Sequence, residues 1–564
     1  MKRALLRAVA RCWPLSVSPD SELRRAVAFL GWGVDAETVV GASYVAAVAL
    51  ALVGLLVQTV LGDSVGLAVA GCCLVCAAVV LATTKLVVAF ASVRRAEALG
   101  DAPALVTRLT MRLSLTPAPG AAAAFGAQSV PGVLADSLAS HVRRTANGPN
   151  TGLQAFGREW RPWLPELERA CSLVESAGRE PAQQRGATLE RARTTVLDGI
   201  HDRTAAFAAS ISGPATALYA FGVLLPLALV ALLPALDAAG VPAPLSLLVV
   251  VYDVLLPLAV TLASAWLLTK RPVAFRPTPI RRSHPDVWSH PTHAVVAGIA
   301  AALLAGWSVR LVFSDWMGFV AAAGAGLGTA LVVAFQPMQS VRSTVEAVEA
   351  GLPDALSLIG RRVTRGTATE RAVEDVATAV PGATGTVLAE VAGRQRRLGV
   401  DLRTAFVGER GALATVPSER AESAASLLAL SAREGRPAGD ALLAMADHLQ
   451  TIDEAEQANR RAVAQVTNTL SNTAAVFAPL VGGATVALSA AMGSAGPLGG
   501  SVATADLGLA VGWYVLVLAI VLTTLATGLT DGLDRSLVGY RVGLALLAAT
   551  ATYLTAFVGA TSLV

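Results

Sequence analysis

The sequence predicts an all-α membrane protein with about nine transmembrane helices and two cytoplasmic helical-bundle domains, built as an internal duplication. Its 564 residues are 54% hydrophobic and only 15% charged, which is too apolar for a chain of several soluble domains. A helix needs about 20 apolar residues to cross a bilayer. Nine runs approach that length: 39–61, 65–90, 214–236, 244–268, 293–313, 317–336, 470–492, 507–529 and 541–562.

The distribution of basic residues predicts the orientation of the chain. Of 44 Lys and Arg residues, 42 fall in five segments between the apolar runs, and the exceptions are Lys85 and Arg310. Loops rich in Lys and Arg stay on the cytoplasmic side of a membrane. We therefore expect a multi-pass protein of the cell membrane, with its N-terminus inside and its C-terminus outside.

The apolar runs divide the chain into eight segments. Both long polar segments lack the alternating β-branched runs of strands, so we expect them to be helical. The segments are 1–38 (basic cytoplasmic N-terminus), 39–90 (first two spans), 91–213 (first cytoplasmic helical domain), 214–268 (third and fourth spans), 269–292 (basic cytoplasmic loop), 293–336 (fifth and sixth spans), 337–469 (second cytoplasmic helical domain) and 470–564 (last three spans).

A colinear set of matches between the two halves predicts the duplication. Ala102-Pro103-Ala104-Leu105 resembles the stretch that begins at Leu352-Pro353, and Val130-Pro131-Gly132 resembles Val380-Pro381-Gly382. The offsets between matched positions stay between 248 and 256, and their order is kept. A repeat this long indicates two related units rather than a short-period solenoid.

The second cytoplasmic segment has the clearest helical pattern. An apolar stripe at helical spacing predicts a helix that buries one face, and Gly366 then ends the pattern. A second glycine, Gly435, separates two later helical runs in the same way. Helices joined by short turns predict a compact antiparallel bundle. The stripe consists of Leu352, Ala355, Leu356, Ile359 and Val363.

These motifs together resemble the type II secretion F family, above all the platform proteins of archaeal pili, archaella and tight-adherence systems. The resemblance covers both halves of the chain and rests on structural positions: Leu352, Pro353, Gly366, Gly435, Phe477 and Pro479. It implies a non-enzymatic membrane platform on which a cytoplasmic hexameric ATPase docks, so that pilin-like subunits leave the bilayer for a filament. In the first half, Thr116-Pro117 stands where the second half has Gly366-Thr367, which implies different partner contacts there.

The absence of a nucleotide-binding motif agrees with this role. The chain has three lysines, and none lies in a GxxxxGK[ST] phosphate loop. His284, His290 and His293 have no Cys or acidic residue beside them that would predict a zinc site. We therefore expect no catalytic residue, no metal and no cofactor. The resemblance favours a homodimer, but the sequence leaves the oligomeric state and the type of filament open.

Two arginine clusters are the candidate partner contact. They could meet an acidic face of the ATPase, or they could anchor the domain on anionic lipid headgroups. No groove-reading motif accompanies them, so nucleic acid is not an expected partner. The clusters are Arg361, Arg362 and Arg365, and Arg394, Arg396 and Arg397.

Asp253 supports the alternative function, a secondary transporter. A carboxylate inside a membrane span is costly and often marks an ion or proton site. Its neighbours Tyr252 and Pro257 allow a structural role instead, as a hydrogen-bond partner between helices. The second half places no acid at the corresponding depth, where a transporter with inverted repeats would place a partner.

Overall fold

The computed structural model describes most of the chain, and all its regular elements are helices. No strand occurs within the described residues. These are residues 13, 18–61, 84–85, 87–129, 132–145, 151–238, 250–271, 280, 284–285, 287, 291–434, 437–495 and 503–563.

The chain divides into two compact units, of which the smaller contains residues 1–98 and 265–271. Within it, α2 (Ser21–Leu30) ends at Gly31, whose φ of 59° is the left-handed cap that glycine adopts most easily. Leu23 and Val27 of α2 then pack against Val39 of α3 (Ala36–Leu61). The first predicted span lies on α3, whereas most of the second span and residues 1–12 and 14–17 of the basic N-terminus lie outside the described residues.

The larger unit contains the remaining residues, and most of the apolar helices lie within it. In the part of the chain that the structure describes, seven helices are long and apolar enough to cross a membrane. The chain is therefore a multi-pass membrane protein, and the count of nine spans stays a prediction. The seven helices are Gln183–Val230, Val251–Thr269, Thr292–Val312, Asp315–Thr364, Gly439–Ala491, Thr504–Thr530 and Arg535–Leu563.

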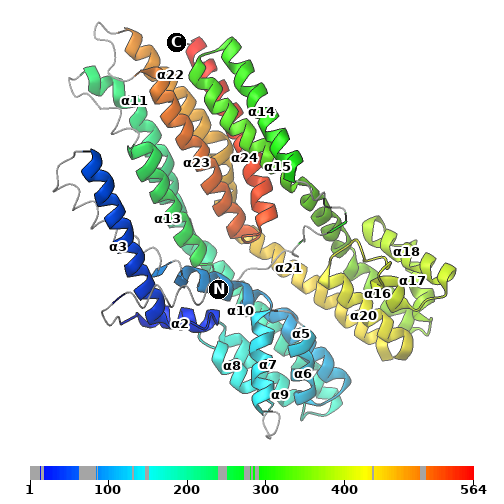
Figure 1. The fold of residues 1–564 in the computed structure, drawn as a ribbon. Coiled ribbons are helices and arrows are strands. Elements are labelled where there is room, and N and C mark those ends of the chain that lie inside the picture. The colour runs from blue at the N-terminus through cyan, green and yellow to red at the C-terminus, as the bar shows by residue number, and fades with distance from the viewer. Residues whose placement is uncertain are drawn as a thin grey trace. The chain divides into compact units, whose positions relative to one another are not determined.

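Apolar helices of the larger unit pack closely against one another, as Figure 1 shows for α14, α15 and α24. Small residues permit the approach. A Cβ built on Gly328 of α15 would lie 2.9 Å from the carbonyl oxygen of Gly543 in α24, so no larger residue fits without movement. The helices of this bundle are α14 (Pro291–Val312), α15 (Asp315–Ala350), α22 (Ala478–Ala495), α23 (Thr504–Thr530) and α24 (Arg535–Leu563).

The first helix group forms a packed core of its own. Phe156 and Trp160 are almost fully buried, together with a set of leucines from α5, α7 and α9. This burial provides the hydrophobic stabilisation that individual helices lack. The group consists of α5 (Ala102–Leu115), α6 (Pro119–Ser129), α7 (Val133–Thr145), α8 (Leu153–Trp160), α9 (Pro165–Ala177) and the first half of α10 (Ala182–Tyr219).

The second helix group contains the predicted apolar stripe. Its five residues are at most 8% exposed and belong to one core cluster, so the predicted amphipathic helix is confirmed. The group consists of α16 (Leu352–Thr364), α17 (Thr369–Ala377), α18 (Gly382–Leu398), α19 (Leu402–Val407), α20 (Glu419–Glu434) and the polar first half of α21 (Pro437–Asn472).

The two helix groups have the same order of elements. Each begins with a helix that has a proline in its first turn and contains five shorter helices before one long helix. Each long helix continues through a π-helical segment into an apolar helix. In the first group these are η1 (Ala220–Leu224) and α11 (Leu225–Ala238), and in the second they are η3 (Thr473–Phe477) and α22.

The turns after α5 and α16 differ, as the sequence suggests. After α16, the Gly366 N–H donates to the Val363 carbonyl over 2.9 Å and the Thr367 N–H to the Arg362 carbonyl over 3.0 Å. Gly366 has a φ of 95°, which favours glycine. After α5, Thr116 is extended instead, with a φ of −137°. The second predicted glycine turn, at Gly435, lies outside the described residues.

Long helices pass through the boundaries that we expected between soluble and membrane segments. The expected boundaries at 213/214 and 336/337 coincide with Pro214 inside α10 and Pro337 inside α15. The boundary at 469/470 lies inside α21. Hence α15 and α21 both join the second helix group to the bundle as continuous helices, which Figure 1 shows.

Candidate functional site

Both predicted arginine clusters lie at the ends of helices in the second helix group. Arg361 and Arg362 occupy the last turn of α16, and Arg365 caps it. Arg396 and Arg397 occupy the last turn of α18. Basic residues are favourable there because the helix dipole places partial negative charge at the C-terminus. The positions of these arginines are therefore consistent with helix stability as well as with partner binding.

Acidic residues of α17 bring the two clusters into one network. Arg362 Nε lies 3.9 Å from Asp375 Oδ2, and Arg396 Nη1 lies 3.0 Å from Glu374 Oε1. Arg371 joins the two acids, 3.4 Å from Asp375 and 3.0 Å from Glu374. Exposed ion pairs contribute little stability individually, so the main effect of this network is to neutralise the charges of Arg362 and Arg396.

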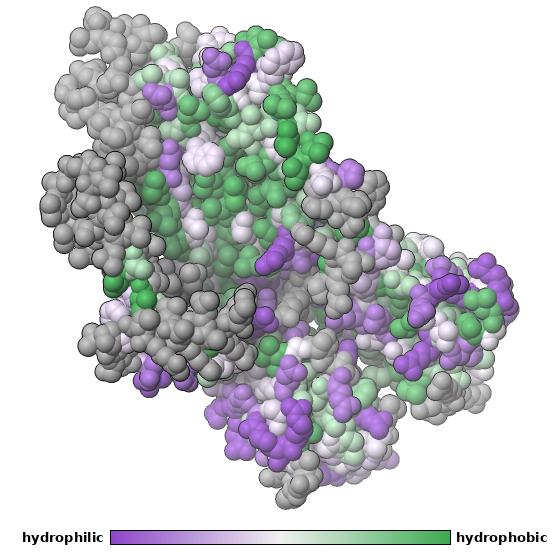
Figure 2. All heavy atoms as spheres, viewed as in Figure 1, coloured by the Kyte–Doolittle hydropathy of each residue, from purple (hydrophilic) through white to green (hydrophobic). Residues whose placement is uncertain are grey.

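Three of the six predicted arginines retain an uncompensated charge. Arg361, Arg365 and Arg397 are exposed, and the described residues provide no ion pair for any of them. By contrast, Arg394 pairs with Glu390 over 2.9 Å. We call Arg361, Arg365 and Arg397 the arginine face. Figure 2 shows hydrophilic residues gathered over the helix groups and hydrophobic residues over the membrane bundle.

A buried ion pair lies where the second helix group meets the bundle. Arg342 of α15 is 5% exposed, and its Nη2 lies 3.1 Å from Asp534 Oδ1 in the turn before α24. Asp534 also accepts hydrogen bonds from the N–H groups of Ser536 (2.9 Å) and Leu537 (3.1 Å). Burial alone would raise the pKa of Asp534, but the Ser536 hydroxyl and the Arg342 charge hold it below its usual value. Asp534 is therefore a carboxylate at neutral pH.

A second acid in the same turn binds two further arginines. Asp531 lies 3.5 Å from Arg460 of α21 and 2.8 Å from Arg541 of α24. Together, Asp531 and Asp534 connect the short turn between α23 and α24 to α15, α21 and α24. We call these two acids with Arg342, Arg460 and Arg541 the charge clamp. Its chemistry is structural, since it holds the two connecting helices to the bundle.

The positions that carry the family resemblance lie in structural roles. Leu352 is buried and Pro353 lies in the first turn of α16, where a proline suits the missing helical hydrogen bond. Phe477 ends the π-helical segment η3 with 53% of its surface exposed, and Pro479 lies in the first turn of α22. These residues shape helices and provide no reactive group.

Asp253 lines a cavity of about 500 Å³ together with a second acid, Asp506 of α23. It belongs to the π-helical segment η2 (Val250–Leu255), and its Oδ1 has no hydrogen-bond partner among the described residues. Trp513 also lines this cavity. A carboxylate in a partly apolar cavity is a candidate site for a proton or a cation. Among the described residues, this cavity included, no group of three or more His, Cys, Asp and Glu side chains could hold a metal ion.

Sequence reasoning missed the residues that organise these sites. Glu374 and Asp375 lie between the two arginine clusters in sequence, but their pairing depends on how α16, α17 and α18 pack. The pair of Arg342 with Asp534 joins residues 192 positions apart, and no local pattern indicates it. The arginine in Ser340-Val341-Arg342 next to an apolar run was the one available signal.

Comparisons of the chain with models of protein families, with curated proteins and with solved structures found no match.

Proposed function

We propose that this chain is the membrane platform of a machine that assembles type IV pilin-like filaments, driven by a cytoplasmic ATPase. The observation that carries the proposal is the continuity of α15 and α21 from the second helix group into the membrane bundle. Such helices transmit a displacement of the helix group to the bundle, as a platform requires. In this proposal the chain crosses the membrane nine times, and both helix groups lie in the cytoplasm.

The arginine face is the proposed docking surface for the ATPase. These three exposed arginines have no ion pair within the described residues, so they can meet acidic side chains without first breaking one there. Complementary charge raises association rates and selects the partner. The α17 network neutralises the neighbouring Arg362 and Arg396, and α15, α21 and the charge clamp carry the resulting force to the bundle.

The order of elements supports the proposed duplication. Both helix groups begin with a proline-containing first turn, end in a long helix and continue into the membrane through a π-helical segment. Short π-helical insertions are rare. Finding one at the equivalent place in both halves favours a common origin over chance.

Co-purification with the pilus-type ATPase of the same genome tests the proposal. We expect wild-type protein in detergent to retain the ATPase. The triple variant Arg361→Glu, Arg365→Glu, Arg397→Glu should retain at least tenfold less ATPase, because each charge reversal replaces attraction by repulsion. The matched control reverses exposed arginines of the first helix group, Arg179→Glu and Arg191→Glu, and should bind normally. Failure of wild-type protein to bind any such ATPase would contradict the proposal.

The same arginines could instead contact anionic lipid. Flotation of the purified protein is uninformative because the chain inserts in bilayers, so the co-purification is repeated with added anionic vesicles. If these arginines bind lipid and not the ATPase, added vesicles should release no ATPase from the wild-type protein. The triple variant should then also retain the ATPase. Retention of the ATPase by the triple variant would therefore move the docking surface away from the arginine face.

A secondary transporter is the second candidate, and the cavity of Asp253 and Asp506 favours it. This function predicts proton entry into proteoliposomes that carry a pH gradient, measured with an enclosed pH-sensitive dye. Asp253→Asn should abolish that entry, because an amide cannot release a proton. Equal leakage from wild-type, Asp253→Asn and empty vesicles would eliminate the candidate.

A further inference from the structure

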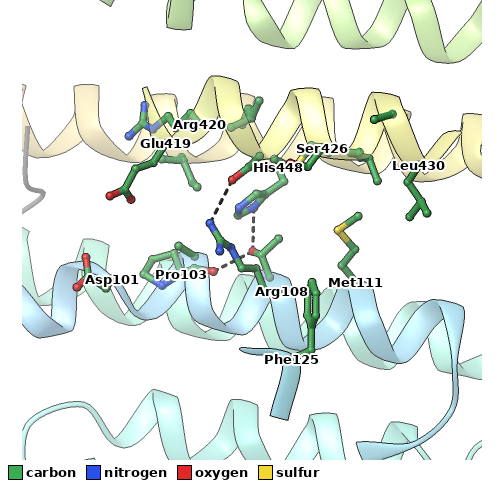
Figure 3. A pocket seen from close by; sticks show the side chains of 18 of the residues that line it. Asp101, Pro103, Arg108, Met111, Phe125, Glu419, Arg420, Ser426, Leu430 and His448 are labelled. Atoms are coloured by element: carbon green, nitrogen blue, oxygen red, sulfur yellow. Dashed lines mark hydrogen bonds between the residues drawn. The ribbon is translucent and has the colours of Figure 1, made fainter. Parts of the chain in front are cut away.

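A cleft of about 590 Å³ lies between the two helix groups within the larger unit (Figure 3). One wall is a face of α5 and the opposite wall comprises faces of α20 and α21, with Phe125 of α6 at one end. Cavities that bind small molecules have volumes of about 300–1,000 Å³ and combine apolar walls with a few polar groups. The cleft meets both criteria.

Apolar side chains form one end of the cleft. Figure 3 places Met111, Phe125 and Leu430 together there. Phe125 and Leu430 are 42% and 37% exposed, although both lie on helices that pack within the helix groups. Exposed large apolar residues gathered in a concave site favour an apolar ligand.

Arg108 provides a cation in the middle of the cleft. Its Nη2 donates to Ser423 Oγ over 3.1 Å, and no described carboxylate lies within ion-pair distance. Burial lowers the pKa of Arg108, and the more distant charge of Glu419 opposes this shift. A partly desolvated guanidinium without an anionic partner is costly, and a carboxylate, sulfonate or phosphate would satisfy it with strong hydrogen bonds.

Arg420 and His448, two further polar residues of the cleft, already have partners within the protein. Arg420 lies 3.6 Å from Glu349 and also pairs with Glu456. His448 Nδ1 lies 3.1 Å from Thr107 Oγ1. His448 belongs to the polar first half of α21, before its apolar stretch, and burial lowers its pKa to about 3 with help from nearby arginines. It is therefore neutral. Arg403 and Glu419 also line the cleft, but Arg403 is exposed, so Arg108 is the half-buried cation that a ligand can reach.

We propose that this cleft binds a small organic anion, with its acidic group on Arg108 and an aromatic or aliphatic body between Met111, Phe125 and Leu430. The inference does not depend on the platform function. Because the ligand would contact α5 on one side and α20 and α21 on the other, its binding would hold the two helix groups together.

Binding of naphthalene-2-sulfonate to the full chain in lipid nanodiscs tests this proposal. Isothermal titration calorimetry should show saturable binding with one site per chain, above the signal of empty discs. Arg108→Gln should weaken binding about tenfold, because it removes the charge-assisted hydrogen bonds. Ser426→Trp should abolish binding by filling the cleft from an exposed position on α20.

Two controls show whether binding depends on Arg108 and on the charge of the ligand. Arg112→Gln removes a neighbouring arginine of α5 that does not line the cleft, and it should leave the affinity unchanged. Naphthalene-2-methanol, which has no charge, should bind at least tenfold more weakly than the sulfonate. Unchanged affinity in both Arg108→Gln and Ser426→Trp, or no saturable binding above empty discs, would overturn the proposal.

Lipid composition identifies the source of the anion. In discs of phosphatidylcholine alone and of phosphatidylcholine with phosphatidylglycerol, a site for a soluble anion gives equal affinities for naphthalene-2-sulfonate. A site that accepts lipid headgroups gives a lower affinity in the anionic discs, by competition, and this difference should disappear in Arg108→Gln. Both results preserve the anion site on Arg108.

Discussion

Arg342 is the most deeply buried charged residue in the described structure. It carries its charge at 5% exposure, and two of its nitrogens have no hydrogen-bond partner among the described residues. Its contacts with Asp534 and Ser536 therefore provide the compensation that the described structure offers. A buried charge that loses its partner costs far more than an exposed ion pair contributes.

Asp534→Asn should therefore destabilise the protein strongly. It leaves Arg342 buried without an anion, and we expect a loss of about 3 kcal/mol, measured as a lower midpoint of thermal unfolding in detergent. Asp531→Asn is the control, since its partners Arg460 and Arg541 are both exposed by 40% or more. That variant should be nearly neutral. Equal midpoints for the two variants would contradict the importance of the buried pair.

His448 should make the stability of the protein depend on pH. Its folded pKa of about 3 lies below the ordinary value of 6.5, so the unfolded chain takes up a proton first as the pH falls. The contribution is fully present above pH 6.5 and is lost progressively below it. At pH 5.5 the loss is about 1.4 kcal/mol.

His448→Gln should remove this pH dependence while keeping a polar partner for Thr107. The measurement compares the unfolding midpoints of both proteins at pH 7.5 and pH 5.5. Wild-type protein should lose more stability on acidification than the variant. The same decrease in both proteins would show that His448 is not the group responsible.

At the scale of elements, contact between α15 and α24 depends on residues without side chains. Gly328→Ala should destabilise the bundle by about 1–3 kcal/mol, because its Cβ would contact the Gly543 carbonyl oxygen and Leu547. Gly559→Ala, elsewhere on α24, meets nothing within 4 Å and is the matched control. Thermal unfolding of both variants checks this, and a neutral Gly328→Ala would indicate looser packing there.

Helices of the second group could be predicted because their information is local. The stripe from Leu352 to Val363 and the positive φ of Gly366 follow from periodicity and from glycine's lack of a Cβ. The ends of α15 and α21 could not be predicted in this way. Hydropathy indicates where a chain leaves the bilayer, whereas a helix continues as long as its backbone hydrogen bonds do, even through Pro337.

The candidate sites could be predicted only in part for a related reason. A cluster such as Arg361 and Arg362 is visible in sequence, but its free charge depends on which acids the fold brings near. Asp375 neutralises Arg362 and leaves Arg361 exposed. The cleft around Arg108 is less predictable still, because its walls come from helices more than 300 residues apart.

At the scale of the whole molecule, two polar helix groups are joined to an apolar bundle by continuous helices and a charge clamp. In the proposed platform function, the arginine face is the docking surface, and α15 and α21 connect it to the membrane bundle. The sequence contains no GxxxxGK[ST] nucleotide-binding motif. A platform driven by another protein accounts for all of them together.

Filament assembly in the native cell tests the central claim most directly. The measurement is the amount of pilin-like subunit in filaments sheared from cells that lack this chain and are complemented with wild-type protein or with Arg361→Glu, Arg365→Glu, Arg397→Glu. We expect no filaments without the chain, recovery with wild-type protein and less than a tenth of that recovery with the triple variant at equal expression. Normal filaments in cells that lack the chain would contradict the platform function.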